Sequence, residues 1–257
     1  MLNGQIVLVT GASRGIGNAI ALTLGGAGAT VIGTATSEEG ADNISKIFSE
    51  SDILGKGMKL NVTDNDQITS VLKAVTDEYG AVDILINNAG YAKHGAFHKT
   101  PLDTHTDMMH LLTTTLTELT YLYSEDMKRL GGGYILLVAS IAGFMPIPQF
   151  ATYAASKAFV LSLGEALNKE LSEFNIKVTT LCPGGTATEF MDVSGQNITG
   201  FRRHAIMTSD AVARAGLRAV AKGKAVIVPG LLYKFSMAGL RAVPRGLQAM
   251  IGEAATK

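Results

Sequence analysis

The sequence predicts an α/β protein with a doubly wound parallel sheet of seven strands and helices on both faces. Two observations support this class. Short runs rich in β-branched and apolar residues alternate with segments of helical length along the whole chain. A glycine-rich turn also follows the first of these runs and opens the first helical segment. Strands separated by helices connect through right-handed crossovers, which give a parallel sheet covered on both sides.

The predicted elements follow one another in a regular order. Strands are expected at residues 6–10, 30–34, 57–60, 82–86, 134–139, 177–181 and 225–228. Helices are expected at residues 16–28, 38–49, 66–79, 101–130, 152–174 and 209–221. No linker rich in proline, serine or charge divides the chain, so a single domain over residues 1–257 is predicted.

The helix at 101–130 carries its own boundary signals. Thr100 is expected as the N-cap, Pro101 at the first helical position and Asp103 in the first turn. Three glycines at 131–133 follow the last apolar position and can end the helix. The sequence therefore predicts one uninterrupted helix of about thirty residues here.

Composition narrows the class of function. Among 257 residues, Lys plus Arg and Asp plus Glu both number 22, so no basic field for nucleic acid is expected. A small substrate without large net charge fits this balance. Cys182 is the only cysteine and cannot form an internal disulfide, and only about four residues precede the first apolar run. Both features argue against secretion and predict a cytoplasmic protein.

The C-terminal stretch 230–251 is apolar with Lys234, Arg241 and Arg245 interspersed. We expect a helix packed on the body or on a neighbouring subunit, and contact with a membrane surface is the less favoured alternative. No run of eighteen apolar residues occurs, so no spanning helix is expected.

Three turns of small residues are expected at the carboxyl ends of strands. Gly11, Gly15 and Gly17 open the first helix, where backbone amides and the helix N-terminus can face a pyrophosphate. A glycine turn alone is equally typical of an ordinary tight connection. Residues 87–90 and 183–188 supply two further turns after the fourth and sixth strands. Together the three turns predict one nucleotide-binding crevice.

Tyr153 and Lys157 lie four residues apart in a predicted helix, with Ser140 thirteen residues before the tyrosine. Positions i and i+4 share one helix face, so the ammonium can lie near the phenol. A nearby positive charge favours the phenolate and lowers a tyrosine pKa that is ordinarily about 10. Tyr153 is therefore predicted to act as a general acid near neutral pH.

These motifs together resemble the short-chain dehydrogenase/reductase family over nearly the whole chain, which implies a Rossmann domain. The resemblance implies that Tyr153 protonates a substrate carbonyl oxygen, that Ser140 holds this oxygen, and that Lys157 lowers the tyrosine pKa and binds the nicotinamide ribose. It divides the chain into a cofactor half, about 1–90, and a substrate half, about 91–257, with a substrate loop at about 189–207. No metal site is expected. The implied cofactor residues are Gly11, Ser13, Arg14, Gly15, Ile16, Gly17, Thr36, Asn61, Val62, Asn88, Ala89, Gly90, Tyr153, Lys157, Pro183, Gly184, Thr186 and Thr188.

Cofactor choice is predicted from two positions. Arg14 lies inside the glycine loop, and the second strand ends without the acid that would bind a ribose 2′-hydroxyl. A guanidinium with the Thr36 hydroxyl suits a 2′-phosphate, which favours NADPH. Glu38 or Glu39 is the alternative, since either carboxylate would suit NADH.

One position departs from the family pattern. Leu112 stands where the family usually has an asparagine that supports a water leading from the lysine to solvent. This change puts the proton relay in doubt, and His110 or Thr113 is a possible substitute. Residues 1–86 resemble bacterial 3-oxoacyl-(acyl-carrier-protein) reductases, whereas residues 87–257 resemble another subgroup of dehydrogenases. A recombined or engineered chimera is therefore one hypothesis.

The predicted function is an NADPH-dependent carbonyl reductase, reversible as an alcohol dehydrogenase, that moves hydride between nicotinamide and a ketone or secondary alcohol. A 3-oxoacyl-(acyl-carrier-protein) reductase is the enzymatic alternative, and a nucleotide-binding sensor or scaffold with little catalysis is the alternative of another class. The resemblance also implies a homodimer or homotetramer. An apolar substrate is suggested by six side chains near the expected pocket, namely Phe144, Met145, Ile147, Phe150, Phe190 and Met191.

Overall fold

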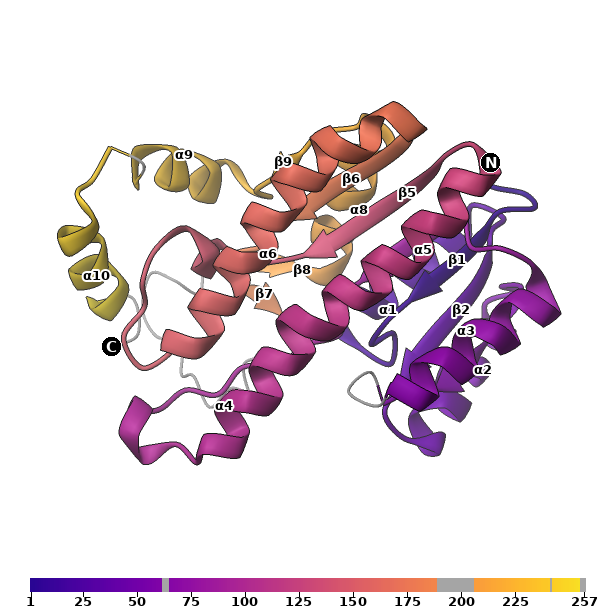
Figure 1. Ribbon diagram of the computed structural model, residues 1–257, viewed down its shortest axis with the longest axis horizontal. Coiled ribbons are helices and arrows are strands. Elements are labelled where there is room, and N and C mark those ends of the chain that lie inside the picture. The colour runs from indigo at the N-terminus through magenta and orange to yellow at the C-terminus, as the bar shows by residue number, and fades with distance from the viewer. Residues whose placement is uncertain (62–64, 189–205, 241, 255–257) are drawn as a thin grey trace.

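The computed structural model describes residues 1–61, 65–188, 206–240 and 242–254. Its centre is a parallel sheet of seven strands in the order β3-β2-β1-β4-β5-β6-β9 (Figure 1). The strands are β1 (Ile6–Val9), β2 (Thr30–Ala35), β3 (Gly55–Lys59), β4 (Ile84–Asn87), β5 (Gly133–Val138), β6 (Ile176–Leu181) and β9 (Val226–Ile227). A second, two-stranded sheet pairs β7 (Thr186–Ala187) with β8 (Met207–Thr208). The predicted fold class is confirmed.

The helices match most of the predicted segments. They are α1 (Gly15–Gly25), α2 (Glu38–Glu50), α3 (Asn65–Tyr79), α4 (Leu102–Met109), α5 (Leu116–Leu130), α6 (Ala151–Glu170), α8 (Ser209–Ala221), α9 (Leu231–Leu240) and α10 (Arg245–Ala254). Short 3-10 turns occur at η1 (Phe97–Lys99), η3 (Ile141–Phe144) and η4 (Leu171–Phe174), and a π-helical segment, η2 (His110–Thr115), joins α4 to α5.

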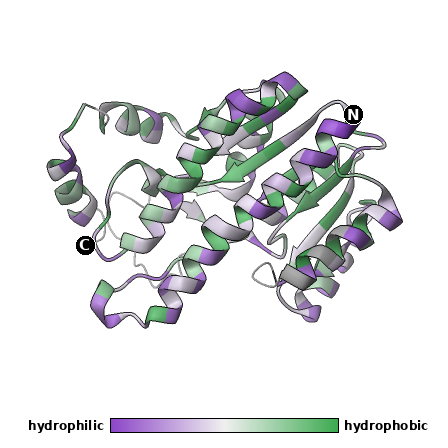
Figure 2. Ribbon diagram, in the orientation of Figure 1, coloured by the Kyte–Doolittle hydropathy of each residue, from purple (hydrophilic) through white to green (hydrophobic). Residues whose placement is uncertain are grey.

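Two hydrophobic layers hold the sheet. Leu8 of β1 packs with α3, α5 and α6 on one face, whereas its neighbours Val7 and Val9 pack with α1, α2 and α8 on the other. Successive side chains of a strand point to opposite faces, so strands buried on both faces must be apolar throughout. Figure 2 shows this as strongly hydrophobic central strands beneath helices with mixed surfaces.

The strand order places the functional crevice. The chain runs outward from β1 through β2 to β3, then returns to β4 on the other side of β1. The helices that leave β1 and β4 therefore depart to opposite faces, and a crevice opens beyond the carboxyl ends of these two strands. All three predicted turns of small residues lie at this edge of the sheet.

The prediction of one helix at 101–130 is wrong in two respects. The helix begins at Leu102 with Pro101 as its N-cap, and the Thr100 hydroxyl donates instead to the Ala96 carbonyl oxygen. The helical hydrogen bonding is also interrupted by the π-helical segment η2. Gly131 ends α5 at φ 83°, a left-handed conformation that suits glycine, as predicted.

The C-terminal stretch forms two helices, α9 and α10, rather than one. Figure 1 shows both in yellow at one side of the body, with α10 close to the segment that leads into α6. Gln248 of α10 is buried, and its amide donates to the carbonyl oxygens of Leu240 and Val243 at 3.1 and 2.8 Å. These bonds fix the turn between the two helices. Within the described residues, no helix combines the length and the apolar character needed to cross a bilayer.

Candidate active site

The glycine loop between β1 and α1 is built for close approach of the backbone. Gly11 and Gly15 have φ values of 66° and 60°, which L side chains rarely adopt. A Cβ placed on Gly17 would stand 2.3 Å from the Gly11 carbonyl oxygen and 2.4 Å from Asn88 Nδ2. The absence of a Cβ at Gly17 therefore lets the first turn of α1 pack directly on Gly11 and Asn88, which brings the helix N-terminus close to the end of β1, where it can bind a pyrophosphate. Ser13 and Ile16, half-buried, complete the loop.

Asn88 braces this loop from the end of β4. Its side-chain amide donates to the carbonyl oxygens of Thr10 and Gly11, both at 3.0 Å. The Thr10 hydroxyl accepts in turn from the backbone amides of Asn88 and Ala89, also at 3.0 Å. Both amide hydrogens of Asn88 are thus used within the protein, so its role in the structure is to position the loop. Ala89 and Gly90 leave the adjoining space open.

The structure places Arg14 and Thr36 at the outer end of the crevice. Arg14 is the exposed N-cap of α1, and Thr36 is exposed one residue after β2. Glu38 is paired with Lys59, with 3.6 Å between Oε1 and Nζ. This exposed ion pair involves one of the two acids, Glu38 and Glu39, that would otherwise favour a ribose 2′-hydroxyl. The exposed guanidinium of Arg14 and hydroxyl of Thr36 are suited to bind a 2′-phosphate.

Two further implied cofactor residues, Asn61 and Val62, follow β3. Asn61 is exposed, and its backbone amide donates to Gln67 Oε1 at 3.0 Å. Val62 lies outside the described residues, as do residues 189–205 of the predicted substrate loop, with Phe190 and Met191 among them.

The segment after β6 lies against the glycine loop. A Cβ on Gly15 would stand 3.1 Å from Thr188 Cγ2, so the two turns meet across the crevice. Thr186 is buried, and its hydroxyl donates to the Gly184 carbonyl oxygen at 3.1 Å. The Pro183 carbonyl oxygen accepts from the Ile141 amide at 3.0 Å, which ties this turn to the end of β5. The structure thus brings together the three turns expected at one crevice.

Tyr233 is a contributor that the sequence analysis missed. Its hydroxyl accepts from the Gly185 backbone amide at 3.1 Å, and a Cβ on Gly184 would stand 2.4 Å from its ring. Helix α9 therefore packs directly on the turn after β6. No sequence signal distinguishes this tyrosine, because it lies 48 residues from Gly185 in the chain.

Ser140, Tyr153 and Lys157 meet at the inner end of the crevice. Ser140 follows β5, and its Oγ accepts from the Ala142 amide at 3.1 Å. A hydrogen bond joins its side chain to the Tyr153 hydroxyl. Lys157 lies one turn further along α6, with Nζ 5.8 Å from the centroid of the Tyr153 ring. The tyrosine and the lysine are 8% and 5% exposed, so the group is almost dry.

Burial dominates the electrostatics of this group. It raises the pKa of Tyr153 to about 12, although the Ser140 hydrogen bond acts in the opposite direction. It also lowers the pKa of Lys157 to about 8. The expected lowering of the tyrosine pKa is therefore wrong for the protein alone. The physical reason is that removal of the phenol from water disfavours the phenolate more than the Ser140 hydrogen bond favours it. Lys157 Nζ donates to the Val138 carbonyl oxygen at 2.7 Å, so the ammonium makes its hydrogen bond with the backbone.

Leu112 fills the place of the family's asparagine. It is 1% exposed, and a Cβ on Gly90 would stand 2.7 Å from Leu112 Cδ2 and 3.9 Å from Lys157 Nζ. The leucine therefore lies beside the gap that separates Gly90 from the lysine. The Thr113 hydroxyl donates to the Met109 carbonyl oxygen at 2.6 Å, so the structure engages it within its own helix.

An aromatic wall stands beside the catalytic tyrosine. The Phe150 ring packs edge-on to Tyr153 with 6.1 Å between centroids, and the His94 ring lies 5.0 Å from Phe150. His94 Nε2 is buried and has no hydrogen-bond partner among the described residues. A buried polar atom of this kind costs free energy unless a ligand or water satisfies it. The sequence analysis missed His94, although a histidine four residues after Gly90 was available as a signal.

Three of the predicted wall residues make further contacts. Met145 and Ile147 line a separate cavity beneath α10. Phe144 packs against the core layer formed with α5 and α6. Ile147 also packs against the cluster that contains Phe150 and Tyr153, so the expectation that these residues line the substrate pocket stays a prediction.

A crevice of glycine turns joined to a dry serine, tyrosine and lysine group defines a class of nucleotide-dependent oxidoreductases. Comparison with known proteins gives the family. The short chain dehydrogenase family matches residues 5–198, and the chain belongs to this family of NAD(P)-dependent oxidoreductases acting on CH–OH groups.

Several relatives are similar over most of their length. A 3-oxoacyl-(acyl-carrier-protein) reductase from Vibrio cholerae serotype O1 is 42% identical over 188 residues, which is 73% of this chain and 76% of the relative. Its counterpart from Escherichia coli K12 is 40% identical over 186 residues, covering 72% and 75%. The likeness to these reductases thus extends well beyond the 86 residues to which the sequence analysis assigned it. The chimera stays a hypothesis.

Solved structures are similar over nearly the whole chain. A short-chain dehydrogenase from Sphingobium yanoikuyae in complex with NADPH has a TM-score of 0.80 and 29% identity, covering 95% of this chain and 98% of that one. A short-chain dehydrogenase from Streptomyces avermitilis has a TM-score of 0.81 and 28% identity, covering 93% and 92%.

Proposed function

We propose that this protein is an NADPH-dependent carbonyl reductase, reversible as an alcohol dehydrogenase. The observation that carries the proposal is the group formed by half-buried Ser140 with buried Tyr153 and Lys157, beside the turns of small residues at the carboxyl ends of the strands. The cofactor supplies hydride to the substrate carbon when bound, and the protein supplies the proton and the orientation.

Each side chain has a role that follows from its position. Ser140 and Tyr153 share a hydrogen bond, so their hydroxyl oxygens lie close together, and a carbonyl oxygen that replaces this bond can accept from both hydroxyls. Tyr153 then donates its proton to the oxygen as hydride reaches the carbon. Lys157, whose pKa burial lowers to about 8, remains largely protonated at neutral pH and stabilises negative charge on the tyrosine.

Preference for NADPH rests on Arg14 and Thr36. Both are exposed where the ribose of the adenosine half would lie, and Glu38 is engaged by Lys59. The Sphingobium yanoikuyae relative, which is named as a complex with NADPH, supports the same choice. Glycine turns that a Cβ would fill are consistent with a bound dinucleotide.

The substrate is proposed to be a small apolar ketone or alcohol. Phe150 beside Tyr153 supports an apolar wall, and the unpartnered His94 Nε2 offers one polar contact near it. Identity of 40–42% to 3-oxoacyl-(acyl-carrier-protein) reductases keeps an acyl thioester as the second candidate substrate. Association into a homodimer or homotetramer is also proposed, and the predicted cytoplasmic location stays a prediction.

The deciding experiment is NADPH turnover with two substrates, a simple aromatic ketone and a 3-oxoacyl thioester. We expect measurable oxidation of NADPH with the ketone. Turnover of the thioester alone would identify the second candidate, and no turnover with either would favour a sensor or scaffold.

Tyr153→Phe should reduce turnover by roughly 10²- to 10⁴-fold while NADPH affinity and the melting temperature stay close to wild type, because only the proton donor is lost. Tyr134→Phe is the matched control, since Tyr134 lies at the start of β5, at the other end of this strand from Ser140. A Tyr153→Phe protein with wild-type turnover would refute the proposed proton donor.

A further inference from the structure

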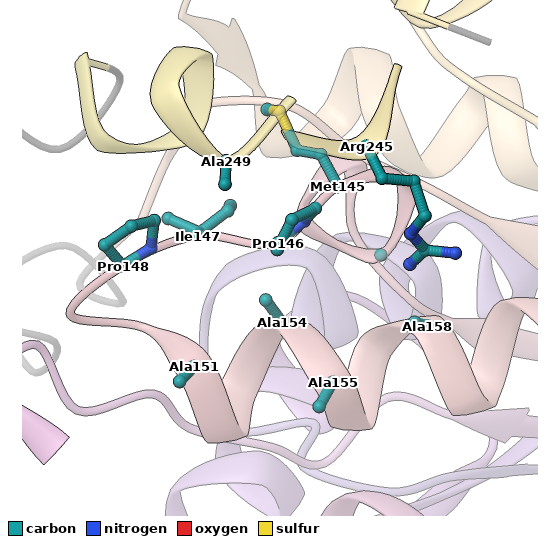
Figure 3. A pocket seen from close by; sticks show the side chains of 11 residues that line it. Met145, Pro146, Ile147, Pro148, Ala151, Ala154, Ala155, Ala158, Arg245 and Ala249 are labelled. Atoms are coloured by element: carbon teal, nitrogen blue, oxygen red, sulfur yellow. The ribbon is translucent and has the colours of Figure 1, made fainter. Parts of the chain in front are cut away.

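A cavity of about 390 Å³ lies beneath α10 (Figure 3). Residues 145–148 form one wall, and the alanines at 151, 154, 155 and 158 of α6 form the floor. Arg245 and Ala249 of α10 form the roof. A cavity of roughly 150 Å³ holds one benzene ring, so this one has room for an apolar chain of roughly ten carbons.

Most of the cavity floor faces away from the reaction centre, and only Ala154 and Ile147 of the lining also pack in the cluster that contains Tyr153. Successive residues of an α-helix are rotated by about 100°, so Ala151, Ala155 and Ala158 lie on the side of α6 opposite Tyr153 and Lys157. Burial agrees with this, because the three alanines are exposed and the two catalytic candidates are buried. A molecule in the cavity would therefore rest on the back of α6.

The roof of the cavity is held in place. A Cβ on Gly252 of α10 would stand 2.3 Å from the Pro146 carbonyl oxygen, so the helix backbone abuts the wall at that point. Gln248 fixes the other end of α10 through its bonds to the turn after α9. The small side chains of Ala154, Ala155 and Ala249 leave the space between these supports open. Such a largely preformed apolar space is typical of ligand sites.

Among the described residues that line the cavity, Arg245 is the only charged one. Figure 3 shows its guanidinium at one end of the cavity, at the side of Ala158, whereas Ala249 faces Ile147. No carboxylate pairs with Arg245 in the part of the chain that the structure describes. The cavity thus combines an apolar body with a cationic end, and a complementary ligand has an apolar chain and a terminal anion.

We propose that this cavity binds a medium-chain carboxylate, with the chain along the alanine face of α6 and the carboxylate on Arg245. The guanidinium is exposed, so the carboxylate lies at the solvent side and needs no burial of charge. The chain rests against residues 145–148, the segment that leads from Ser140 to Tyr153. This site requires neither the cofactor nor the reaction.

The test is calorimetric titration of the whole protein with decanoate and with decanol. Wild type should bind decanoate, and saturating NADPH should leave this binding unchanged. Arg245→Gln should weaken decanoate about tenfold and leave decanol unchanged, because only the anion contacts the guanidinium. Arg218→Gln is the matched control, an exposed arginine of α8 that is outside the cavity. It should bind decanoate as wild type does.

Filling the cavity gives an independent test. Ala249→Phe and Ala155→Leu enter it from α10 and from α6, and each should abolish binding of both ligands. Ala155 is exposed on its helix, so its replacement leaves the fold intact even if Ala249→Phe does not, and circular dichroism checks both. Absence of decanoate binding to wild type, full binding to folded Ala155→Leu, or equal binding by wild type and Arg245→Gln would each overturn the proposal. Displacement of decanoate by NADPH would overturn it too, because it would place the ligand in the reaction centre.

Discussion

Lys157 and Tyr153 show at the residue scale that a catalytic arrangement works against stability. Burial disfavours the charged form of each side chain. It lowers the pKa of Lys157 to about 8 and raises the pKa of Tyr153 to about 12. The ammonium still donates to the carbonyl oxygen of Val138, the last residue of β5 and two residues before Ser140. The charge is thus retained at neutral pH inside a dry site, which is where it has most effect on a developing phenolate.

The pKa of Lys157 gives a prediction of stability against pH. Between about pH 8 and pH 10.5 the unfolded chain holds a proton that the folded protein has lost, so wild-type stability should rise through this window. Relative to Lys157→Met, the free energy of unfolding should rise by about 2.5 kcal/mol between pH 7 and pH 10, measured by urea unfolding. Lys169→Met on the same helix is the control, because this lysine is exposed and should give no such rise. A pH-independent difference between wild type and Lys157→Met would contradict the depressed pKa.

Arg14 gives a prediction of cofactor selectivity. Arg14→Ala should weaken NADPH roughly tenfold to a hundredfold and leave NADH nearly unchanged, because the variant loses a charged partner of the 2′-phosphate. Dissociation constants for the two cofactors, measured by fluorescence of the reduced nicotinamide, check this. Arg214→Ala, in the ion pair with Asp210 on α8, is the control. Equal loss of both cofactors would mean that Arg14 holds the pyrophosphate.

At the scale of elements, the π-helical segment between α4 and α5 is the least expected feature. Leu112 lies within it and reaches toward Gly90, whose missing Cβ makes the contact possible. A π-helical turn is wider than an α-helical turn, so the side chains after it face a different direction from those of a continuous α-helix. Such π-bulges are frequent at functional sites. Here the bulge directs a leucine to the space beside Lys157.

Leu112→Asn tests whether a proton route was lost at this position. If the family's water relay is missing, an amide here should raise turnover roughly two- to tenfold or shift its pH dependence. The unfolding free energy should fall by about 1 to 3 kcal/mol, because a buried amide replaces an apolar side chain. Leu112→Met, which keeps the apolar volume, is the control for packing. If the folded, NADPH-binding asparagine variant is slower than wild type, the relay is not missing, and His110 is the next position to change.

On the scale of the whole molecule, the two halves of the chain share one sheet. β4 pairs with β1 on one side and with β5 on the other, so the crevice crosses the boundary between the predicted cofactor and substrate halves. The division at about residue 90 stays a prediction. Apolar side chains also remain uncovered along α4 and α5, including Leu102, Met109 and Tyr121, which are 73%, 50% and 64% exposed. A surface of this kind is typical of an interface.

The exposed face of α4 and α5 gives a prediction of assembly. Wild type should sediment as a dimer or tetramer, and Tyr121→Glu should shift it to monomer, because a carboxylate would be buried at the interface. Leu54→Glu is the control, since Leu54 is equally exposed but lies between α2 and β3. A monomeric wild type, or a Tyr121→Glu variant that still associates, would contradict this interface.

Much of this protein is determined by local sequence. Continuous apolar runs that alternate with helical segments, together with glycine turns, predicted the fold class. The spacing of Tyr153 and Lys157 predicted that both lie on one face of a helix, because helix periodicity is a property of the backbone. The exact ends of helices were predicted less well. Thr100 was expected to cap a helix, but its hydroxyl donates to the Ala96 carbonyl oxygen four residues earlier.

Other features depend on contacts between distant residues, and only the tertiary structure decided them. The Asn88 amide is used up on the glycine loop, Tyr233 packs on Gly184, and Lys157 turns to the Val138 carbonyl oxygen. The pKa of Tyr153 also rises where the i, i+4 spacing alone predicted a fall, since desolvation depends on everything packed around the phenol. Sequence spacing thus determines which side chains can share a helix face, whereas the surrounding packing determines their hydrogen-bond partners and their pKa values.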